Sequence, residues 1–147
     1  MWLEGWRYFS SELEVGMSFA RQILASSGRK SPFDAGAVVD AVDALSDCIQ
    51  ACITDIDADL GEKDVAEMVR CIRLCLDCTD VCEATLGILS RPAEYDPGVV
   101  RPLLESCVAI CKSCGDECER HAHEFEHCRI CEEACRRCES ACRKLLA

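Results

Sequence analysis

Fourteen of the fifteen cysteines in this 147-residue chain fall into seven CxxxC pairs, and this spacing limits the folds open to it. Three segments join two pairs as CxxxCxxCxxxC, at residues 71–82, 107–118 and 131–142, and the seventh pair is Cys48 and Cys52. Steps of 4, 3 and 4 residues return to one face of an α-helix, so each segment predicts a helix with a single row of sulfur. The chain is therefore expected to bury helical faces made largely of cysteine.

The remaining pattern predicts an all-α protein. Asp96 and Pro97 supply a helix cap and a first-turn proline, and Ser31 with Pro32 supply the same pair earlier in the chain. Helices are expected over residues 2–27, 32–60, 62–89, 97 to beyond 118, and in a last segment that holds 128–142. Short connections favour antiparallel neighbours. The prediction is an up-down-up-down four-helix bundle of residues 31–147, preceded by an amphipathic helix and linker, residues 1–30.

Charge and hydropathy exclude several functions. The formal charge of −11, from 27 acidic and 16 basic residues, argues against binding nucleic acid or an anionic membrane surface. No stretch approaches the roughly 20 apolar residues that span a bilayer, and the N-terminus lacks an export signal. A cytoplasmic location is therefore expected, where thiols stay reduced and structural disulfides are rare.

Thiolate chemistry indicates which metal the rows would bind. Thiolate is a soft donor that suits Cu(I), whereas zinc prefers a closed tetrahedron of four ligands, often from CxxC motifs. Residues four apart on a helix lie about 5–6 Å apart at Cβ, so each CxxxC pair can bind Cu(I) with two sulfurs. One monovalent ion per thiolate also leaves a nearly neutral core. We expect about one Cu(I) per cysteine. The alternative, that the cysteines act only as small buried hydrophobes, is weak for so large a set.

Antiparallel topology predicts that one end of the bundle forms a mouth for metal. The residues expected there are Asp55, Asp59, Met68, His121 and Cys128, with His123 and His127 as further candidates. Thioether and imidazole bind Cu(I) without a permanent charge, which suits transient sites. Two alternatives stay open at this point. The histidines could be solvated turn residues and Met68 a core plug, and the two aspartates could face outward on a rotated helix.

The first bundle helix also carries an apolar outer face that needs a cover. Ile49, Ile53, Ile56 and Leu60 follow the same 4-3-4 steps as the cysteines, one residue later. We expect the N-terminal helix to cover them through Trp2, Trp6, Phe9 and Leu13, from its own chain or a neighbour. The end of the bundle opposite the mouth is predicted to be closed by Val38, Ala41, Leu45, Leu86, Leu89, Val100, Leu104 and Leu145.

Over residues 34–147 the sequence resembles the cytosolic branch of the four-helix bundle copper storage proteins. The resemblance is carried by CxxxCxxCxxxC at 71–82 and 107–118, by the cysteine-rich run at 114–142 and by the C-terminal ArgLysLeuLeu. It implies a homo-oligomer, a tetramer or dimer, whose inward thiols hold many Cu(I) ions, with histidines near one mouth and no catalysis. The chain departs from the family where Asp55 and Asp59 continue a row of two cysteines.

The resulting hypothesis is a non-enzymatic protein that stores or buffers copper. The expected metal ligands are Cys48, Cys52, Cys71, Cys75, Cys78, Cys82, Cys107, Cys111, Cys114, Cys118, Cys128, Cys131, Cys135, Cys138, Cys142, His121, Met68, Asp55 and Asp59. One alternative is a metal-dependent redox protein or cluster carrier that uses a mixed Asp/His/Met/Cys site at the mouth. Another is a structural bundle with redox-sensing thiols.

Overall fold

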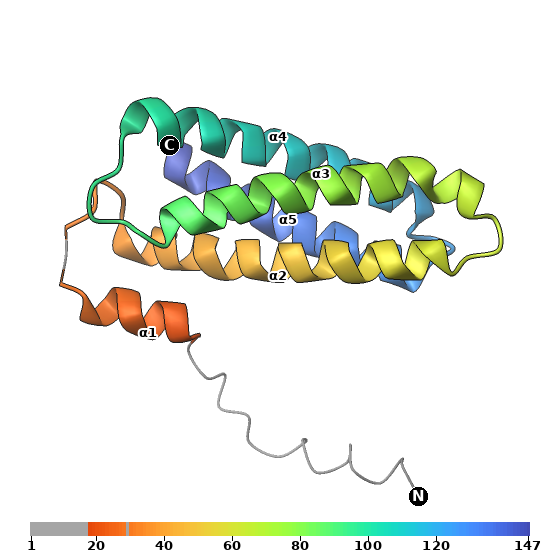
Figure 1. Ribbon diagram of the computed structural model, residues 1–147, viewed down its shortest axis with the longest axis horizontal. Coiled ribbons are helices and arrows are strands. Elements are labelled where there is room, and N and C mark those ends of the chain that lie inside the picture. The colour runs from red at the N-terminus through yellow and green to blue at the C-terminus, as the bar shows by residue number, and fades with distance from the viewer. Residues whose placement is uncertain (1–17, 29) are drawn as a thin grey trace, which may run out of the picture.

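A computed structural model describes residues 18–28 and 30–147, and all regular structure in these ranges is helical (Figure 1). The helices are α1 (Phe19–Ser26), α2 (Ala35–Leu60), α3 (Val65–Leu89), α4 (Pro97–His121) and α5 (Glu126–Leu146). Four long helices run antiparallel and a short helix precedes them, which confirms the predicted fold class. None of the described helices combines the length and the apolar character that crossing a bilayer requires.

The four long helices form a closed ring. Each packs against its neighbours in sequence, and α5 closes the ring by packing against α2. Within the described chain, the backbones of diagonally opposite helices do not come close to each other, which holds for α2 with α4 and for α3 with α5. Side chains therefore fill the space between them. The inward faces therefore share one long, narrow interior along the bundle axis (Figure 1).

Helix starts agree with the sequence at α4 and differ at α2 and α3. Asp96 caps α4 by accepting a hydrogen bond from the backbone nitrogen of Gly98 at 2.8 Å, and Pro97 is the first helical residue. The predicted start at Ser31 and Pro32 is wrong, because Asp34 is the cap of α2 and accepts from the backbone nitrogen of Ala37. Before it, Phe33 leaves the helical path and packs edge-on against Tyr95, with ring centroids 5.3 Å apart. Helix α3 likewise begins later than predicted, after Asp64.

The predicted continuous helix over residues 2–27 is also wrong where the structure describes it. Ser18 lies outside α1 and caps it by accepting a hydrogen bond from the backbone nitrogen of Arg21. A cap residue has non-helical backbone angles, so a helix cannot pass through it unbroken. Ser18 also donates to Asp43 at 2.6 Å, and Arg21 pairs with Asp40 and Asp43. These contacts hold α1 against the first half of α2. Residues 1–17 lie outside the described residues, and so does the predicted cover formed by Trp2, Trp6, Phe9 and Leu13.

Candidate metal centre

All fifteen cysteines lie inside the bundle as free thiols, each with 0% exposure. The 4-3-4 spacing gives α3, α4 and α5 one complete row each, and α2 contributes Cys48 and Cys52. Because the helices are antiparallel and in a ring, the four rows face one another. The interior is a column of sulfur along much of the bundle axis.

The closest sulfur atoms belong to different helices. Sγ–Sγ distances are 3.6 Å between Cys75 and Cys114, and 3.7 Å between Cys71 and Cys118. Further along the axis, the Sγ atoms of Cys107 and Cys142 lie 3.8 Å apart. The sequence predicted that the two sulfurs of one CxxxC pair would bind a metal ion together. The closest contacts instead join sulfurs of neighbouring helices, because the packing of the helices brings their rows together. Small shifts of such atoms would let one Cu(I) bridge them.

Groups of four donors connect into a continuous network. The following sets have ligand atoms that all lie within 4.8 Å of one another: Cys48, Cys82, Cys111 and Cys138; Cys48, Cys52, Cys78 and Cys135; Cys52, Cys114, Cys131 and Cys135; Cys75, Cys114, Cys118 and Cys131. Neighbouring sets share members, as Cys48 does in the first two. Thiolates shared between sites favour a chain of metal ions over isolated centres.

Asp55 and Asp59 face inward, so the rotated-helix alternative for α2 is excluded. They are 2% and 0% exposed and continue the row of Cys48 and Cys52. Asp55 Oδ2 accepts from the thiol of Cys75 at 3.6 Å and from that of Cys71 at 3.8 Å. Asp55, Cys71, Cys75 and Cys118 together form a further four-donor group. The carboxylate oxygen of Asp55, a hard donor, thus lies among the sulfur atoms of Cys71, Cys75 and Cys118.

His127 connects these aspartates to the surface. Its Nδ1 lies 2.7 Å from Asp55 Oδ1 and 3.6 Å from Asp59 Oδ1, and its Nε2 lies 3.1 Å from Glu62 Oε1. The Sγ of Cys128 lies 3.5 Å from the same Nδ1 and 3.7 Å from Asp59 Oδ1. The other carboxylate oxygen of Asp59 is buried without a hydrogen-bond partner. Such an orphaned acceptor beside a thiol and an imidazole is suited to a cation.

The pKa values at this end reflect burial and crowding of negative charge. Burial and Cys131 raise the pKa of Asp55 to about 6, although His127 opposes the rise. Burial and Cys71 raise the pKa of Asp59 to about 8. Burial opposes a charge on His127, but its contacts with Asp55 and Glu62 outweigh burial and raise the imidazole pKa. The pKa of the Cys128 thiol is raised by its contact with Cys71, by burial and by both aspartates.

The other mouth candidates differ in position. Met68 is buried at the base of a polar hollow of about 420 Å³ that is also lined by Glu62, Glu67 and Glu124. His121 is half-buried, and its Nε2 lies 3.4 Å from Oε1 of the buried Glu117. His123 is exposed in the turn. From the sequence, His127 was only a further candidate for the mouth, because its contact with Asp55 depends on how α5 packs against α2.

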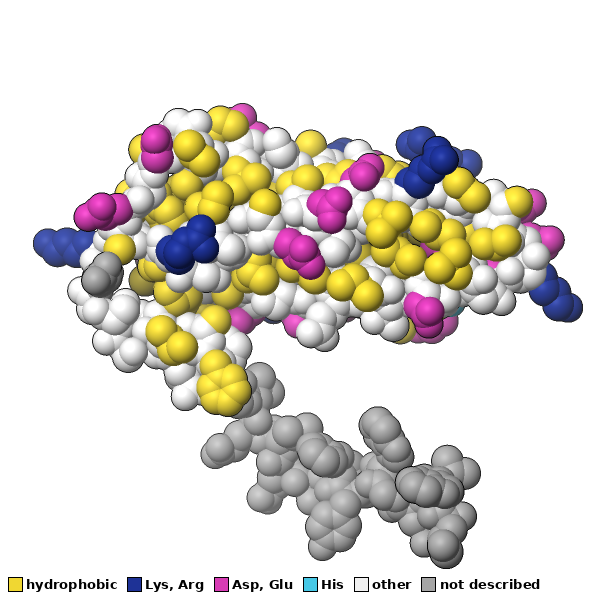
Figure 2. All heavy atoms as spheres, in the orientation of Figure 1, with side chains coloured by type: hydrophobic (Ala, Val, Ile, Leu, Met, Phe, Trp, Pro, Cys, Tyr) yellow, Lys and Arg dark blue, Asp and Glu magenta, His cyan; other side chains and the backbone are white. Residues whose placement is uncertain are grey.

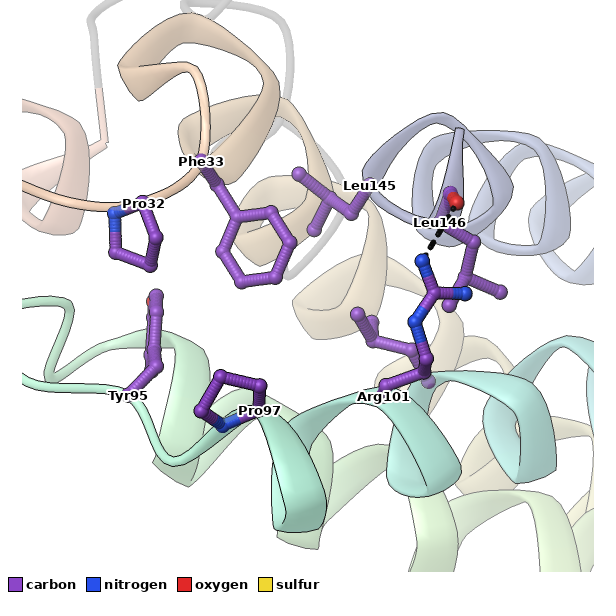
Figure 3. Close-up of a pocket in the computed structure, with 8 residues that line it drawn as sticks. Pro32, Phe33, Tyr95, Pro97, Arg101, Leu145 and Leu146 are labelled. Atoms are coloured by element: carbon purple, nitrogen blue, oxygen red, sulfur yellow. Dashed lines mark hydrogen bonds between the residues drawn. The ribbon is translucent and has the colours of Figure 1, made fainter.

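The opposite end is closed by apolar side chains, as predicted. Seven of the eight predicted residues are buried there, and Leu86 is partly buried. Outside them lies an apolar pocket of about 190 Å³ between Phe33, Tyr95 and Leu145 (Figure 3). Arg101 spans its rim and donates to the backbone oxygen of Leu146 at 3.3 Å. On this side the sulfur rows of α4 and α5 stop at Cys107 and Cys142, and the buried Leu104 and Leu145 lie beyond them.

Comparisons with known proteins agree with this donor set. A family model for copper storage proteins matches residues 35–147. The structure is similar to the copper storage protein Ccsp from Streptomyces lividans loaded with 10 copper equivalents, at 44% identity and a TM-score of 0.83, covering 86% of this chain and 97% of that one. A second structure, described as a cytosolic copper storage protein from Streptomyces lividans with five coppers, matches at 49% identity and a TM-score of 0.74 over 76% and 92% of the two chains.

The matches from Bacillus subtilis have lower sequence identity. The Cu(I)-bound copper storage protein BsCsp3 is 29% identical with a TM-score of 0.65, over 73% of this chain and 95% of that one. The uncharacterized cysteine-rich protein YhjQ from strain 168 is 31% identical over 93 residues, which is 63% of this chain and 81% of that protein. With the family model matched over the whole bundle, the chain belongs to the copper storage protein family and binds multiple Cu(I) ions through the cysteine clusters buried inside the bundle.

Proposed function

We propose that this protein stores Cu(I) in the cytosol at about one ion per cysteine, with all fifteen thiols as ligands. The observation that carries the proposal is the sharing of sulfur atoms between successive four-donor groups. An enzyme or a cluster carrier needs one defined centre, whereas a store needs many equivalent sites. The cytosolic location is supported by the description of the Streptomyces lividans relative and by the free thiols.

The charge balance of the interior favours monovalent copper. Burying fifteen thiolates without cations would be prohibitive, so the thiols of the metal-free protein hold most of their protons. Each Cu(I) that binds a deprotonated thiol replaces one proton and leaves the net charge of the site unchanged. A divalent ion at every thiolate would instead accumulate positive charge. Loading should therefore release about one proton per Cu(I).

Copper is proposed to enter and leave at the end of the bundle that holds Asp55, Asp59 and Cys128. The side chain of His127 is 26% exposed and contacts Asp55, so its imidazole reaches both solvent and the donor group that Asp55 forms with Cys71, Cys75 and Cys118. Met68 and His121 are proposed as additional transient ligands beside it. The acidic hollow above Met68 would attract cations to this end.

The assembly is proposed to be a homo-oligomer, a tetramer or dimer, on the resemblance to the copper storage family. Sedimentation of the metal-free, reduced protein measures its mass directly. A single species at the mass of one chain over the whole concentration range would contradict this part of the proposal.

Metal competition tests storage of Cu(I) against the redox or carrier alternative. Reduced protein receives equal, excess amounts of Cu(I) and Zn²⁺ without oxygen, is desalted, and is analysed for both metals and for free thiols. We expect copper in large excess over zinc and no bound iron in the protein as purified. Zinc filling a few sites while most thiols stay free would favour a small number of specific centres.

The access route is tested by the rate of copper uptake. His127→Ala should slow transfer of Cu(I) from a chromophoric chelator while leaving the final copper content close to that of the unsubstituted protein. His123→Ala, at an exposed position in the connection before α5, is the matched control and should leave the rate unchanged. Equal rates for both variants and the unsubstituted protein would place the access route elsewhere.

A further inference from the structure

Two stripes of aliphatic side chains lie along the outer face of α2 and α3. They consist of Ile49, Ile53, Ile56 and Leu60 on α2, and Val65, Val69, Ile72 and Leu76 on α3. Ile53 and Leu60 are 51% and 59% exposed, and Val69 and Leu76 are 43% and 49% exposed. Ile49 is buried in the core at 9% exposure, and Ile56 and Ile72 are partly buried against it, so they form the floor of this surface. Figure 2 shows hydrophobic side chains gathering over the right-hand half of these two helices. An apolar surface of this extent is typical of an interaction site.

The antiparallel register of α2 and α3 brings the two stripes together. Cys48 on α2 contacts Cys78 on α3, with 3.8 Å between their Sγ atoms. The same register places Ile49 beside Leu76 and Leu60 beside Val65. Both stripes repeat in steps of 4, 3 and 4 residues, so they stay paired along their whole length. They form the two walls of one shallow groove, which we call the α2/α3 groove.

The N-terminal segment is tethered at one end of this groove. Ser18 contacts Asp43 and Arg21 contacts Asp40, so α1 runs antiparallel to α2 and the chain before Ser18 begins beside Asp43. At about 1.5 Å per residue, Ile53 lies about 15 Å and Leu60 about 25 Å further along α2. Seventeen residues precede Ser18, enough to reach Leu60 even as a helix. Because Ser18 is a cap, the chain can change direction there and leave the face that α1 covers.

The sequence of this segment matches the groove. Trp2, Trp6, Phe9 and Leu13 repeat in steps of 4, 3 and 4 residues, the spacing of both walls. We propose that residues 2–13 form a helix that lies in the α2/α3 groove of the same molecule, antiparallel to α2. In this arrangement Leu13 faces Ile49, and Trp2 faces Leu60. The four residues 14–17 connect it to Ser18 and span up to about 13 Å.

The segment is an addition to the family bundle, because the family match begins at residue 35. In this proposal it is a helix additional to α1–α5, and it covers the exposed aliphatic side chains of the α2/α3 groove. This role concerns only the outside of the bundle and does not depend on copper.

Tryptophan fluorescence tests the proposal cleanly, because Trp2 and Trp6 are the only tryptophans in the chain. The full-length, reduced, metal-free protein is compared with a synthetic peptide of residues 1–17, which serves as the exposed reference. We expect a blue-shifted emission and protection from acrylamide quenching in the protein, unchanged on dilution. Quenching as efficient as in the peptide would overturn the proposal.

Groove variants identify the docking surface. Ile53→Lys and Leu76→Glu, both at half-exposed positions, should abolish the blue shift and the protection while circular dichroism shows an intact bundle. Ile130→Glu, at a position on α5 that is 50% exposed, is the matched control and should change neither. If the groove variants alter only the sedimentation mass, the groove is an interface between copies and the proposal is wrong. Protection that disappears on dilution would assign the segment to a neighbouring chain and contradict docking within one molecule.

Discussion

The imidazole Nδ1 of His127 lies 2.7 Å from Oδ1 of Asp55, a carboxylate that is 2% exposed and occupies a cysteine position of its row. Through this contact a partly exposed side chain in the first turn of α5 reaches the donors in the interior of the bundle. The same carboxylate accepts from three thiols, those of Cys71, Cys75 and Cys118. Copper arriving at His127 would therefore be one ligand exchange away from the sulfur column.

The stability of the metal-free protein should fall as pH rises from about 5 to about 8. The pKa of Asp55 is raised to about 6 and that of Asp59 to about 8, so the folded protein holds more protons than the unfolded chain across this range. The raised pKa of His127 acts in the same direction, since its stabilising charge is lost as pH rises. Urea unfolding of reduced protein at several pH values measures the slope. Asp59→Asn should flatten it, and stability that increases toward pH 8 would contradict the assignment.

Replacing both inward aspartates by cysteine should raise the copper capacity by about two ions. Asp55 and Asp59 are buried in the row of Cys48 and Cys52, so thiols there would complete a fourth row. The measurement is copper retained against a strong chelator, with free thiols counted on the same sample. Asp57→Cys adds a thiol on the exposed face of the same helix and should add no retained copper. Equal gains from inner and outer thiols would show that burial does not determine capacity.

Leu104→Ala should destabilise the protein by about 2–5 kcal/mol without speeding copper uptake. Leu104 is 0% exposed at the closed end and lines the apolar pocket beside Phe33 and Tyr95, so its truncation removes packing contacts and enlarges that pocket. Urea unfolding gives the stability, and transfer from a chelator gives the uptake rate. Val99→Ala, at a 53% exposed position of the same helix, should change neither. Faster uptake by Leu104→Ala would reveal a second route through the closed end.

Gly115 and Arg136 should show strong coupling in a double-mutant cycle. A Cβ at Gly115 would lie 3.0 Å from Nη1 of Arg136, whose guanidinium pairs with Asp116 at 2.8 Å and Glu119 at 3.2 Å. With Arg136→Ala in place, Gly115→Ala should stabilise by about 1 kcal/mol, the helix propensity difference. With Arg136 present, displacement of the guanidinium should cancel most of this gain. Equal effects in both backgrounds would mean that the arginine moves aside freely.

The cysteine spacing, the capping residues and the short connections were enough to predict four helices, their antiparallel order and the apolar closed end. A 4-3-4 repeat fixes which face of a helix is buried, and short connections favour antiparallel neighbours. The sequence could not predict which sulfurs touch, since the contact of Cys75 with Cys114 depends on the packing of α3 against α4. It also left the direction of Asp55 open, because Ile49, Ile53, Ile56 and Leu60 offered a competing apolar face. The predicted helix start at Ser31 was wrong, because the packing of Phe33 on Tyr95 outweighed the local capping signal. The role of each ligand stays a prediction.

Anaerobic titration of the reduced protein with Cu(I), read against a chromophoric chelator and with total copper and free thiols counted on the same sample, tests storage most directly. The sulfur column predicts saturation near one Cu(I) per cysteine, with all fifteen thiols protected at the end point. Saturation at two or three ions, with most thiols still free, would contradict it.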